Sequence, residues 1–121
     1  MPLIGVPVRI TAELLYALAR MGHGDSIVIA DANFPSDSVA TCCSLEKRPI
    51  RVSGSTAQIT ADILKLMPLD AYVPHPVNVM DRVDSDKERN LEVPAYKDIA
   101  LASGLRSDQL AYVERVRLVL K

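Results

Sequence analysis

Residues able to transfer protons stand close together in one stretch of this chain, MGHGDSIVIADANFP, which covers residues 21–35. Histidine is the side chain that changes charge near neutral pH, so His23 is the first candidate for a general acid or base. A glycine on each side of it allows a positive φ or the close approach of a ligand. Asp31 follows a short apolar run typical of a buried strand, and loops at strand ends often carry the chemistry of α/β folds. His23 and Asp31 are therefore candidate functional residues.

Both residues also have a structural interpretation. A histidine in a turn after a helix can cap the carboxyl end of that helix, and composition alone favours this interpretation of His23. Asp31 can accept a hydrogen bond within the turn that follows it. Three further residues have equally ordinary interpretations: Asp70 as a turn cap, Met80 as a core residue and Arg115 as one side of a surface salt bridge.

The spacing of apolar and capping residues predicts the elements that position these side chains. Thr11 suits the N-cap of a helix over 12–21, and Ser55 and Gln58 have capping-box spacing for a second helix that stops at Pro68. Pro94 suits the first position of a third helix that ends near residue 103. Short strands are predicted at 27–30, 50–52, 69–73 and 77–83, with loops over 33–48 (including a helical turn near residue 38) and 84–92, while 109–121 fits either a helix or a strand. Helices alternating with strands predict an α/β fold, layered α/β/α around a central sheet.

Composition excludes several classes of protein. At 121 residues with 49% hydrophobic and 24% charged residues, the chain has the size and balance of one globular domain, 1–121. A net charge of −1 with scattered basic residues argues against nucleic-acid and anionic membrane partners. Neither an apolar run long enough to span a bilayer nor a secretory leader is visible, so we expect a cytoplasmic protein. Cys42 and Cys43 are adjacent and are expected to be free thiols, and no residue spacing suggests a metal site.

The stretch MGHGDSIVIADANFP resembles the signature of the fucose mutarotase/D-ribose pyranase family (RbsD/FucU), and the branch of animal-type fucose mutarotases most closely. The resemblance extends through ITAELLYALARMGHGD, ILKLMPLDAYV, VNVMDRVDSDKERNLEVPAY and LAYVER, almost without gaps, to about residue 115. It implies an RbsD-like fold and an isomerase that interconverts the α and β anomers of L-fucose or a related monosaccharide. An acid protonates the ring oxygen, a base accepts the proton of the anomeric hydroxyl, and the open-chain aldehyde rotates and closes again. No cofactor is required, because no redox change occurs.

The resemblance also implies roles for individual residues. His23 matches the proton donor of the family, and Asp70 matches a catalytic carboxylate of the animal-type enzymes. Asp31 and Arg115 would hold sugar hydroxyls, which suits charged hydrogen-bonding groups. Met80 would contact the sugar.

The spacing of His23 and Asp31 poses a geometric problem. If the residues between them are extended at ~3.3 Å each, the two side chains lie on the order of 20 Å apart, too far for one pyranose to bridge. Either the turn carries His23 back over the sheet or a neighbouring subunit supplies one of the groups. Members of the family are ring-like homo-oligomers with sites at subunit contacts, so self-association is expected.

The chain departs from the family after Arg115. On an alignment without gaps, Val119 stands where the family has a catalytic tyrosine, and a Tyr-Gly-Asn motif that binds sugar has no counterpart. Matching Tyr112 to that tyrosine would need a deletion. We therefore expect a domain that is incomplete at its C-terminus, lacks the family's last helix and strands, and is impaired in activity and stability. The alternatives are a non-catalytic sugar-binding or regulatory protein of the same fold and an oligomer-forming domain without a ligand.

Overall fold

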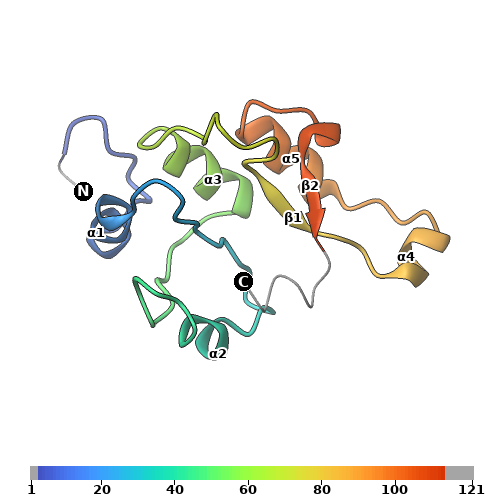
Figure 1. The fold of residues 1–121 in the computed structure, drawn as a ribbon, viewed down its shortest axis with the longest axis horizontal. Helices are drawn as coiled ribbons and strands as arrows, with labels where there is room; N and C mark the ends of the chain where they lie inside the picture. The colour runs from blue at the N-terminus through green and yellow to red at the C-terminus, as the bar shows by residue number, and fades with distance from the viewer. Residues whose placement is uncertain (1–2, 114–121) are drawn as a thin grey trace. The chain divides into compact units, whose positions relative to one another are not determined.

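The computed structural model describes residues 3–113, and the chain falls into two compact units, Met1–Pro68 and Leu69–Lys121 (Figure 1). The first unit contains helices α1 (Ala12–Arg20), α2 (Ser36–Ala40) and α3 (Thr56–Leu64). The second contains strand β1 (Asn78–Met80), helices α4 (Asp84–Glu88) and α5 (Pro94–Ala102), the 3₁₀ turn η1 (Ser107–Gln109) and strand β2 (Ala111–Val113). The single domain expected over 1–121 stays a prediction.

Local capping signals define the two longer helices of the first unit. The Oγ1 atom of Thr11 accepts a hydrogen bond from the Leu14 amide at 3.1 Å, and α1 ends where Met21 turns extended. At α3, the Ser55 hydroxyl accepts from the Gln58 amide at 3.1 Å, while the Gln58 side chain accepts from the Ser55 amide at 2.9 Å. These reciprocal bonds satisfy two amides that the helix itself leaves without partners. Both predicted helix starts are confirmed.

Four buried residues, one before α1 and the others on α1 and α3, form the core of the first unit: Ile10, Leu14, Ile59 and Ile63. Alternate residues of two extended segments, 27–30 and 50–52, pack against it: Ile27, Ile29, Ile50 and Val52. Val28, between two of these, is 57% exposed. Each segment therefore has the in-and-out alternation of a strand.

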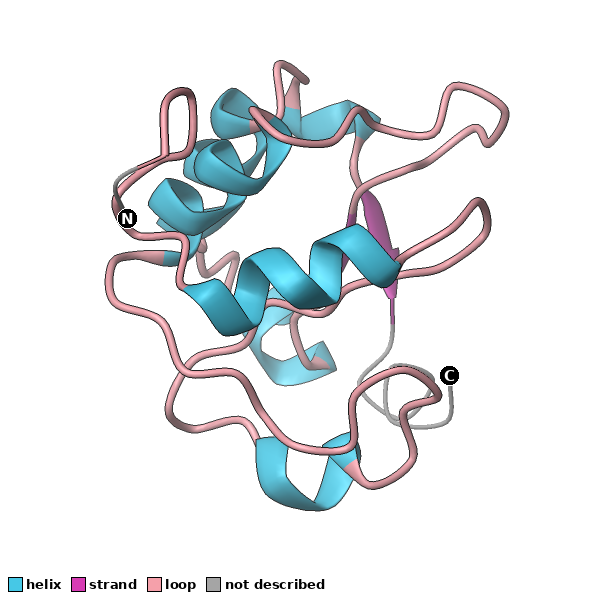
Figure 2. Ribbon diagram, turned by 90° about the vertical axis from the view of Figure 1, so that its left-hand side faces the viewer, coloured by secondary structure: helices cyan, strands magenta, loops and turns pink. Residues whose placement is uncertain are grey.

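The predictions of hydrogen-bonded strands at 27–30, 50–52 and 69–73 are wrong for the described residues, which place loops there (Figure 2). Side-chain alternation needs only a core to face, whereas a strand also needs a neighbour that completes its hydrogen-bond ladder. Within residues 3–113, backbone ladder bonds link only β1 and β2. In the third segment the Asp70 carboxylate accepts from the Tyr72 amide at 2.9 Å, which closes a turn instead.

The second unit is built on a parallel pair of strands with α5 packed beside it. Strands β1 and β2 lie side by side, with Val79 opposite Tyr112, and the Asp81 amide extends the ladder by donating to the Val113 carbonyl at 2.9 Å (Figure 1). A second core cluster joins this pair to α5 and the turn after it: Val79, Ala100 and Leu110. The predicted helix over 94–103 is confirmed, and the predicted strand over 77–83 is confirmed for its central residues.

The predicted loop over 84–92 contains helix α4, which is a correction. Asp84 and Asp86 lie in its first turn and Lys87 in its last, the arrangement that a helix dipole favours. This local charge order was visible in the sequence.

Helices around a parallel strand pair confirm the α/β class. No helix within residues 3–113 is long and apolar enough to cross a membrane.

Candidate functional site

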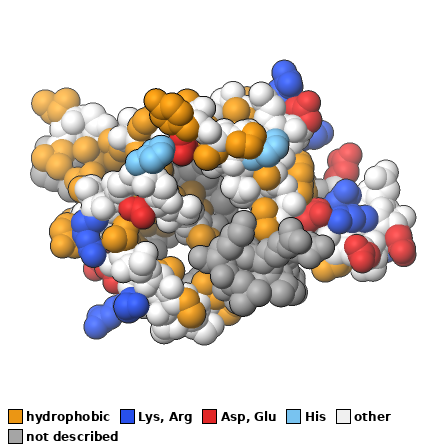
Figure 3. All heavy atoms as spheres, in the orientation of Figure 1, with side chains coloured by type: hydrophobic (Ala, Val, Ile, Leu, Met, Phe, Trp, Pro, Cys, Tyr) orange, Lys and Arg blue, Asp and Glu red, His pale blue; other side chains and the backbone are white. Residues whose placement is uncertain are grey.

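His23 lies in an exposed turn directly after α1. The turn is closed by the Gly22 amide, which donates to Asp25 Oδ2 at 2.7 Å, and by the Asp25 amide, which donates to the Gly22 carbonyl at 3.1 Å. Gly24 adopts a φ of +89°, the left-handed region that favours glycine. The histidine side chains of the chain are visible on the surface in Figure 3. The sequence thus predicted both the turn and its need for glycine.

Asp31 lies at the other end of the extended segment and is also exposed. Its Oδ1 atom accepts from the Asn33 amide at 3.0 Å, and its carbonyl accepts from the Phe34 amide at 3.2 Å. The structural interpretation of Asp31 as a turn-capping residue is therefore confirmed. The hydrogen bond from the Asn33 amide engages only Oδ1, so the second carboxylate oxygen, Oδ2, can also accept a hydrogen bond.

A hollow of about 430 Å³ opens beside Asp31 within the first unit, between residues 29–32 and the start of α3. We call it the Asp31 hollow. The larger apolar residues that line it are Ile29, Val52 and Ile59. Its polar lining comes from three others: Asp31, Ser55 and Thr56. No local sequence pattern indicated this hollow, because its two walls lie some twenty residues apart in the chain.

The remaining candidates belong to the second unit or lie outside the described residues. Asp70 is half-buried and accepts from the Tyr72 amide, so its interpretation as a turn cap is confirmed. Met80 is half-buried on β1, and its carbonyl accepts from the Tyr96 hydroxyl at 2.6 Å. Arg115 lies outside residues 3–113. The structure therefore brings His23 and Asp31 into one unit, while Asp70 and Met80 belong to the other.

A second hollow, of about 620 Å³, lies at the carboxyl end of β1 within the second unit, next to a close ion pair. Asp81 directly follows β1, and its carboxylate lies 2.7 Å from the Lys87 ammonium. The hydrogen bond from Lys87 lowers the pKa of Asp81, and the same bond raises the pKa of Lys87. Charged side chains of both signs gather over α4 in Figure 3. This pair holds the last turn of α4 against the end of β1.

Two tyrosines form the aromatic wall of this second hollow. The rings of Tyr96 and Tyr112 meet edge to face with centroids 5.2 Å apart. Burial raises the pKa of Tyr96, whose hydroxyl donates to Met80, and the Tyr112 hydroxyl donates to the Ser107 carbonyl at 2.8 Å. No motif or spacing in the sequence marked these two tyrosines as functional residues. Their polar groups are engaged in internal bonds, so they support β1 and the position of Met80.

The cysteines and the acidic residues do not form a metal centre among the described residues. Cys42 and Cys43 are free and exposed, as expected. Within residues 3–113 no three histidine, cysteine or carboxylate side chains are grouped closely enough to hold a metal ion.

The chain is similar to proteins of known name over most of its length. Fucose mutarotase from Homo sapiens is 52% identical over 95 residues, which cover 78% of this chain and 60% of that protein. Fucose mutarotase from Bos taurus is 42% identical over 121 residues, covering 93% of this chain and 77% of that protein. The crystal structure of FucU from Bifidobacterium longum superposes with a TM-score of 0.81 at 32% identity, covering 96% of this chain and 80% of that chain.

The chain spans about 60% of the length of the human relative. The described fold is that of the FucU structure, so the RbsD-like fold expected from the sequence is confirmed. A model of the RbsD / FucU transport protein family matches residues 5–120, nearly the whole chain. Together with the bovine relative, this match shows that the chain belongs to the RbsD/FucU family.

Proposed function

We propose that this chain is a sugar mutarotase that interconverts the α and β anomers of L-fucose or a closely related monosaccharide. The observation that carries the proposal is the 52% identity over 95 residues to a protein named fucose mutarotase. The exposed, glycine-flanked His23 supports it, because a group that exchanges protons with a sugar must be reachable by that sugar.

The proposed reaction needs one proton delivered and one removed. A protonated group gives its proton to the ring oxygen as the bond from C1 to that oxygen breaks, while a base takes the proton of the anomeric hydroxyl. The aldehyde that forms rotates about the C1–C2 bond, and the reverse transfers close the ring on the other face. We assign the proton transfers to His23 and Asp70, and sugar contacts to Asp31, Met80 and Arg115. An acid–base pair of this kind typically accelerates a reaction by ~10²–10⁴-fold.

The test is magnetisation exchange between the two anomeric protons of L-fucose, measured by NMR with and without the chain. The chain should raise the exchange rate above that of the sugar alone, and His23→Asn should lower the added rate by about 10²-fold. His75→Asn is the matched control, because His75 is also exposed and its Nδ1 lies 3.3 Å from the Gln109 carbonyl. Fucose binding without exchange would mean a non-catalytic sugar-binding protein. Equal loss in both variants would remove His23 from the mechanism.

We also propose that the protein works as a homo-oligomer in which neighbouring chains share sites. The separation of His23 and Asp31 in the chain supports this, because an extended stretch of that length would hold the two side chains on the order of 20 Å apart. Mixing the inactive variants His23→Ala and Asp31→Ala should then restore part of the exchange, since some mixed sites would combine one intact residue from each chain. Light scattering that finds only monomers, together with no restored activity, would contradict the proposal.

The exposed free thiols of Cys42 and Cys43 support a cytoplasmic location, where thiols stay reduced.

A further inference from the structure

Cys42 and Cys43 form a pair of adjacent thiols just after α2, in the first unit. Both side chains are free and exposed. Neither is among the residues to which we assign the sugar reaction, and the sequence contains no other cysteine. Two adjacent thiols can together bind one atom that accepts two sulfur ligands, which a single cysteine cannot do. The pair is therefore a candidate site for a ligand that needs both sulfurs.

Hydrogen bonds on both sides of the pair hold its backbone in a turn. The Cys42 amide donates to the Val39 carbonyl at 3.0 Å. The Cys43 amide donates to the Ala40 carbonyl at 3.0 Å, and the Cys43 carbonyl accepts from the Lys47 ammonium at 3.1 Å. Consecutive Cα atoms are about 3.8 Å apart, whereas a disulfide usually needs about 4.4 Å or more. A disulfide between Cys42 and Cys43 would therefore strain this turn, so we expect the pair to persist as two thiols.

The two sulfur atoms lie back along the same turn. Cys43 Sγ lies 3.9 Å from the Val39 carbonyl oxygen. Cys42 Sγ lies 3.9 Å from Thr41 Oγ1, whose hydroxyl donates to the Ser38 carbonyl at 2.7 Å. Ser38 and Val39 are consecutive residues of α2, so both thiols face the carboxyl end of that helix. A ligand that bridges them must form its two sulfur bonds on one side, at an angle rather than in line.

Trivalent arsenic has the properties that this pair requires. It is a soft centre that favours thiolate sulfur, and its bonds are pyramidal, so two sulfur ligands lie on the same side of the arsenic atom. An arsenic atom between the sulfurs also spares the turn the strain of closing an S–S bond of ~2.05 Å. Soft cations that bind two thiolates in a line, such as Cu(I), fit the pair less well. We propose that Cys42 and Cys43 form a binding site for trivalent arsenicals.

Phenylarsine oxide is the probe of this class, and its reaction with the pair balances without an oxidant. Each thiol gives its proton to the oxygen of the arsenical, which leaves as water, and two As–S bonds replace the As=O double bond. Arsenic stays trivalent, and both sulfurs keep their oxidation state. Once the first As–S bond has formed, the neighbouring thiol is present at a high effective concentration, and such linkage raises affinity by ~10²–10⁴-fold.

Native mass spectrometry of the full chain tests the proposal, after incubation with phenylarsine oxide and a wash in excess glutathione. Glutathione competes with any bond to a single protein thiol, so the adduct should survive only where both sulfurs bind. Cys42→Ser and Cys43→Ser are matched variants that each keep one thiol, and each should bind the arsenical at least about 10²-fold more weakly than the unmodified chain. Ethanedithiol should release the adduct from the unmodified chain, because it supplies two sulfurs of its own.

A second readout needs no variant. One equivalent of phenylarsine oxide per chain should block both thiols from an aromatic disulfide reagent, and blocking of a single thiol at that ratio would overturn the proposal. An adduct that either serine variant retains as well as the unmodified chain would also overturn it, because one sulfur would then be enough. Anomer exchange plays no part in these measurements, so the arsenical site and the proposed function stand or fall separately.

Discussion

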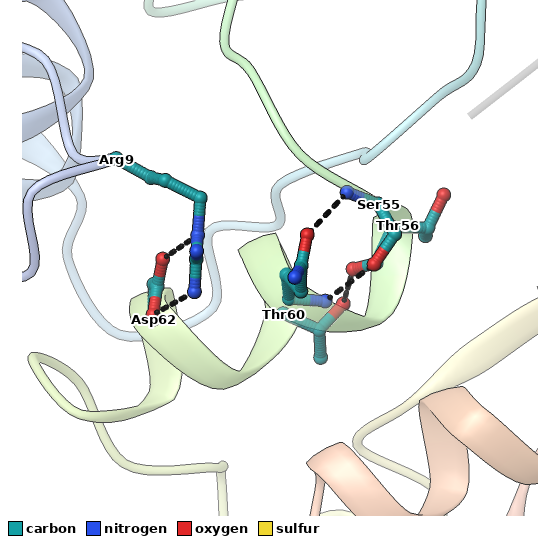
Figure 4. Close-up of polar contacts among 6 residues, drawn as sticks. Arg9, Ser55, Thr56, Thr60 and Asp62 are labelled. Atoms are coloured by element: carbon teal, nitrogen blue, oxygen red, sulfur yellow. Dashed lines mark hydrogen bonds and ion pairs between the residues drawn. The ribbon is translucent and has the colours of Figure 1, made fainter.

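The ion pair between Arg9 and Asp62 joins the residues before α1 to α3 across 53 positions of the chain. Two bonds form it: Nε lies 2.7 Å from Oδ2 and a terminal guanidinium nitrogen lies 3.3 Å from Oδ1 (Figure 4). The Asp62 side chain is only 3% exposed, whereas that of Arg9 is 37% exposed. Arg9→Met would leave a buried carboxylate without its partner. Removing one side of a fully buried pair costs 3–5 kcal/mol, and because water reaches Arg9 we expect about 2–3 kcal/mol here.

Urea unfolding followed by circular dichroism measures this cost, and an exposed pair of the same chemistry provides the control. Arg106 Nε lies 3.0 Å from Asp108, but both side chains are more than 70% exposed, so Arg106→Met should cost less than about 0.5 kcal/mol. The double variant Arg9→Met, Asp62→Leu should recover most of the loss, since it leaves no buried charge. A loss for Arg9→Met no larger than that of Arg106→Met would refute the reasoning, because the pair would then contribute no more than a surface contact.

Three further predictions test other parts of the chain. Gly54→Ala should cost about 1–3 kcal/mol in urea unfolding, because a Cβ at a φ of +119° is strained and meets Arg9; Gly24→Ala, with open space around it, should cost less. The pKa of Asp81 is lowered from 3.8 and that of Lys87 raised from 10.5, so their pair should stabilise the protein between these pH values. That stabilisation should be lost as the pH falls below 3.8 or rises above 10.5, and Lys87→Met should flatten the acid side of a stability profile. An aromatic disulfide reagent should modify both Cys42 and Cys43 without denaturant; burial of either thiol would contradict this.

The helices were predictable because the signals that start them are local. Thr11, the Ser55–Gln58 pair and Pro94 each act within one turn of the helix that they begin. The charge order of α4 was equally local, and attending to the positions of Asp84 and Lys87 would have identified that helix. Strands depend on partners distant in sequence. The apolar run at 27–30 predicted a buried strand, but Val28 is exposed while Ile27 and Ile29 pack against the core, and the run carried no information about a neighbouring strand.

The same distinction applies to the candidate site. Glycines beside His23 predicted an exposed turn, and the end of an apolar run predicted the position of Asp31. The Asp31 hollow could not be predicted from the sequence, because Val52 and Ser55 approach Asp31 only after α3 packs on the core. The bond from Tyr96 to the Met80 carbonyl spans 16 positions and likewise has no local signature. Sequence patterns therefore identified residues that could react, while tertiary packing determines what surrounds them.

The structural and functional interpretations of Asp31 and Asp70 are compatible, and one substitution separates them. Each residue closes a turn by accepting a backbone amide at a single oxygen, Oδ1. Asparagine retains an oxygen acceptor at that place but loses the charge and the second acceptor. Asp31→Asn and Asp70→Asn should therefore keep the melting temperature within about 2 °C while lowering anomer exchange, since a loss of 0.5 kcal/mol or less shifts it little. Asp31→Ala, which cannot cap the turn, should lower both. If the asparagine variants exchange L-fucose at the original rate, these carboxylates serve the turns alone, because the one property that was removed would then have no part in the reaction.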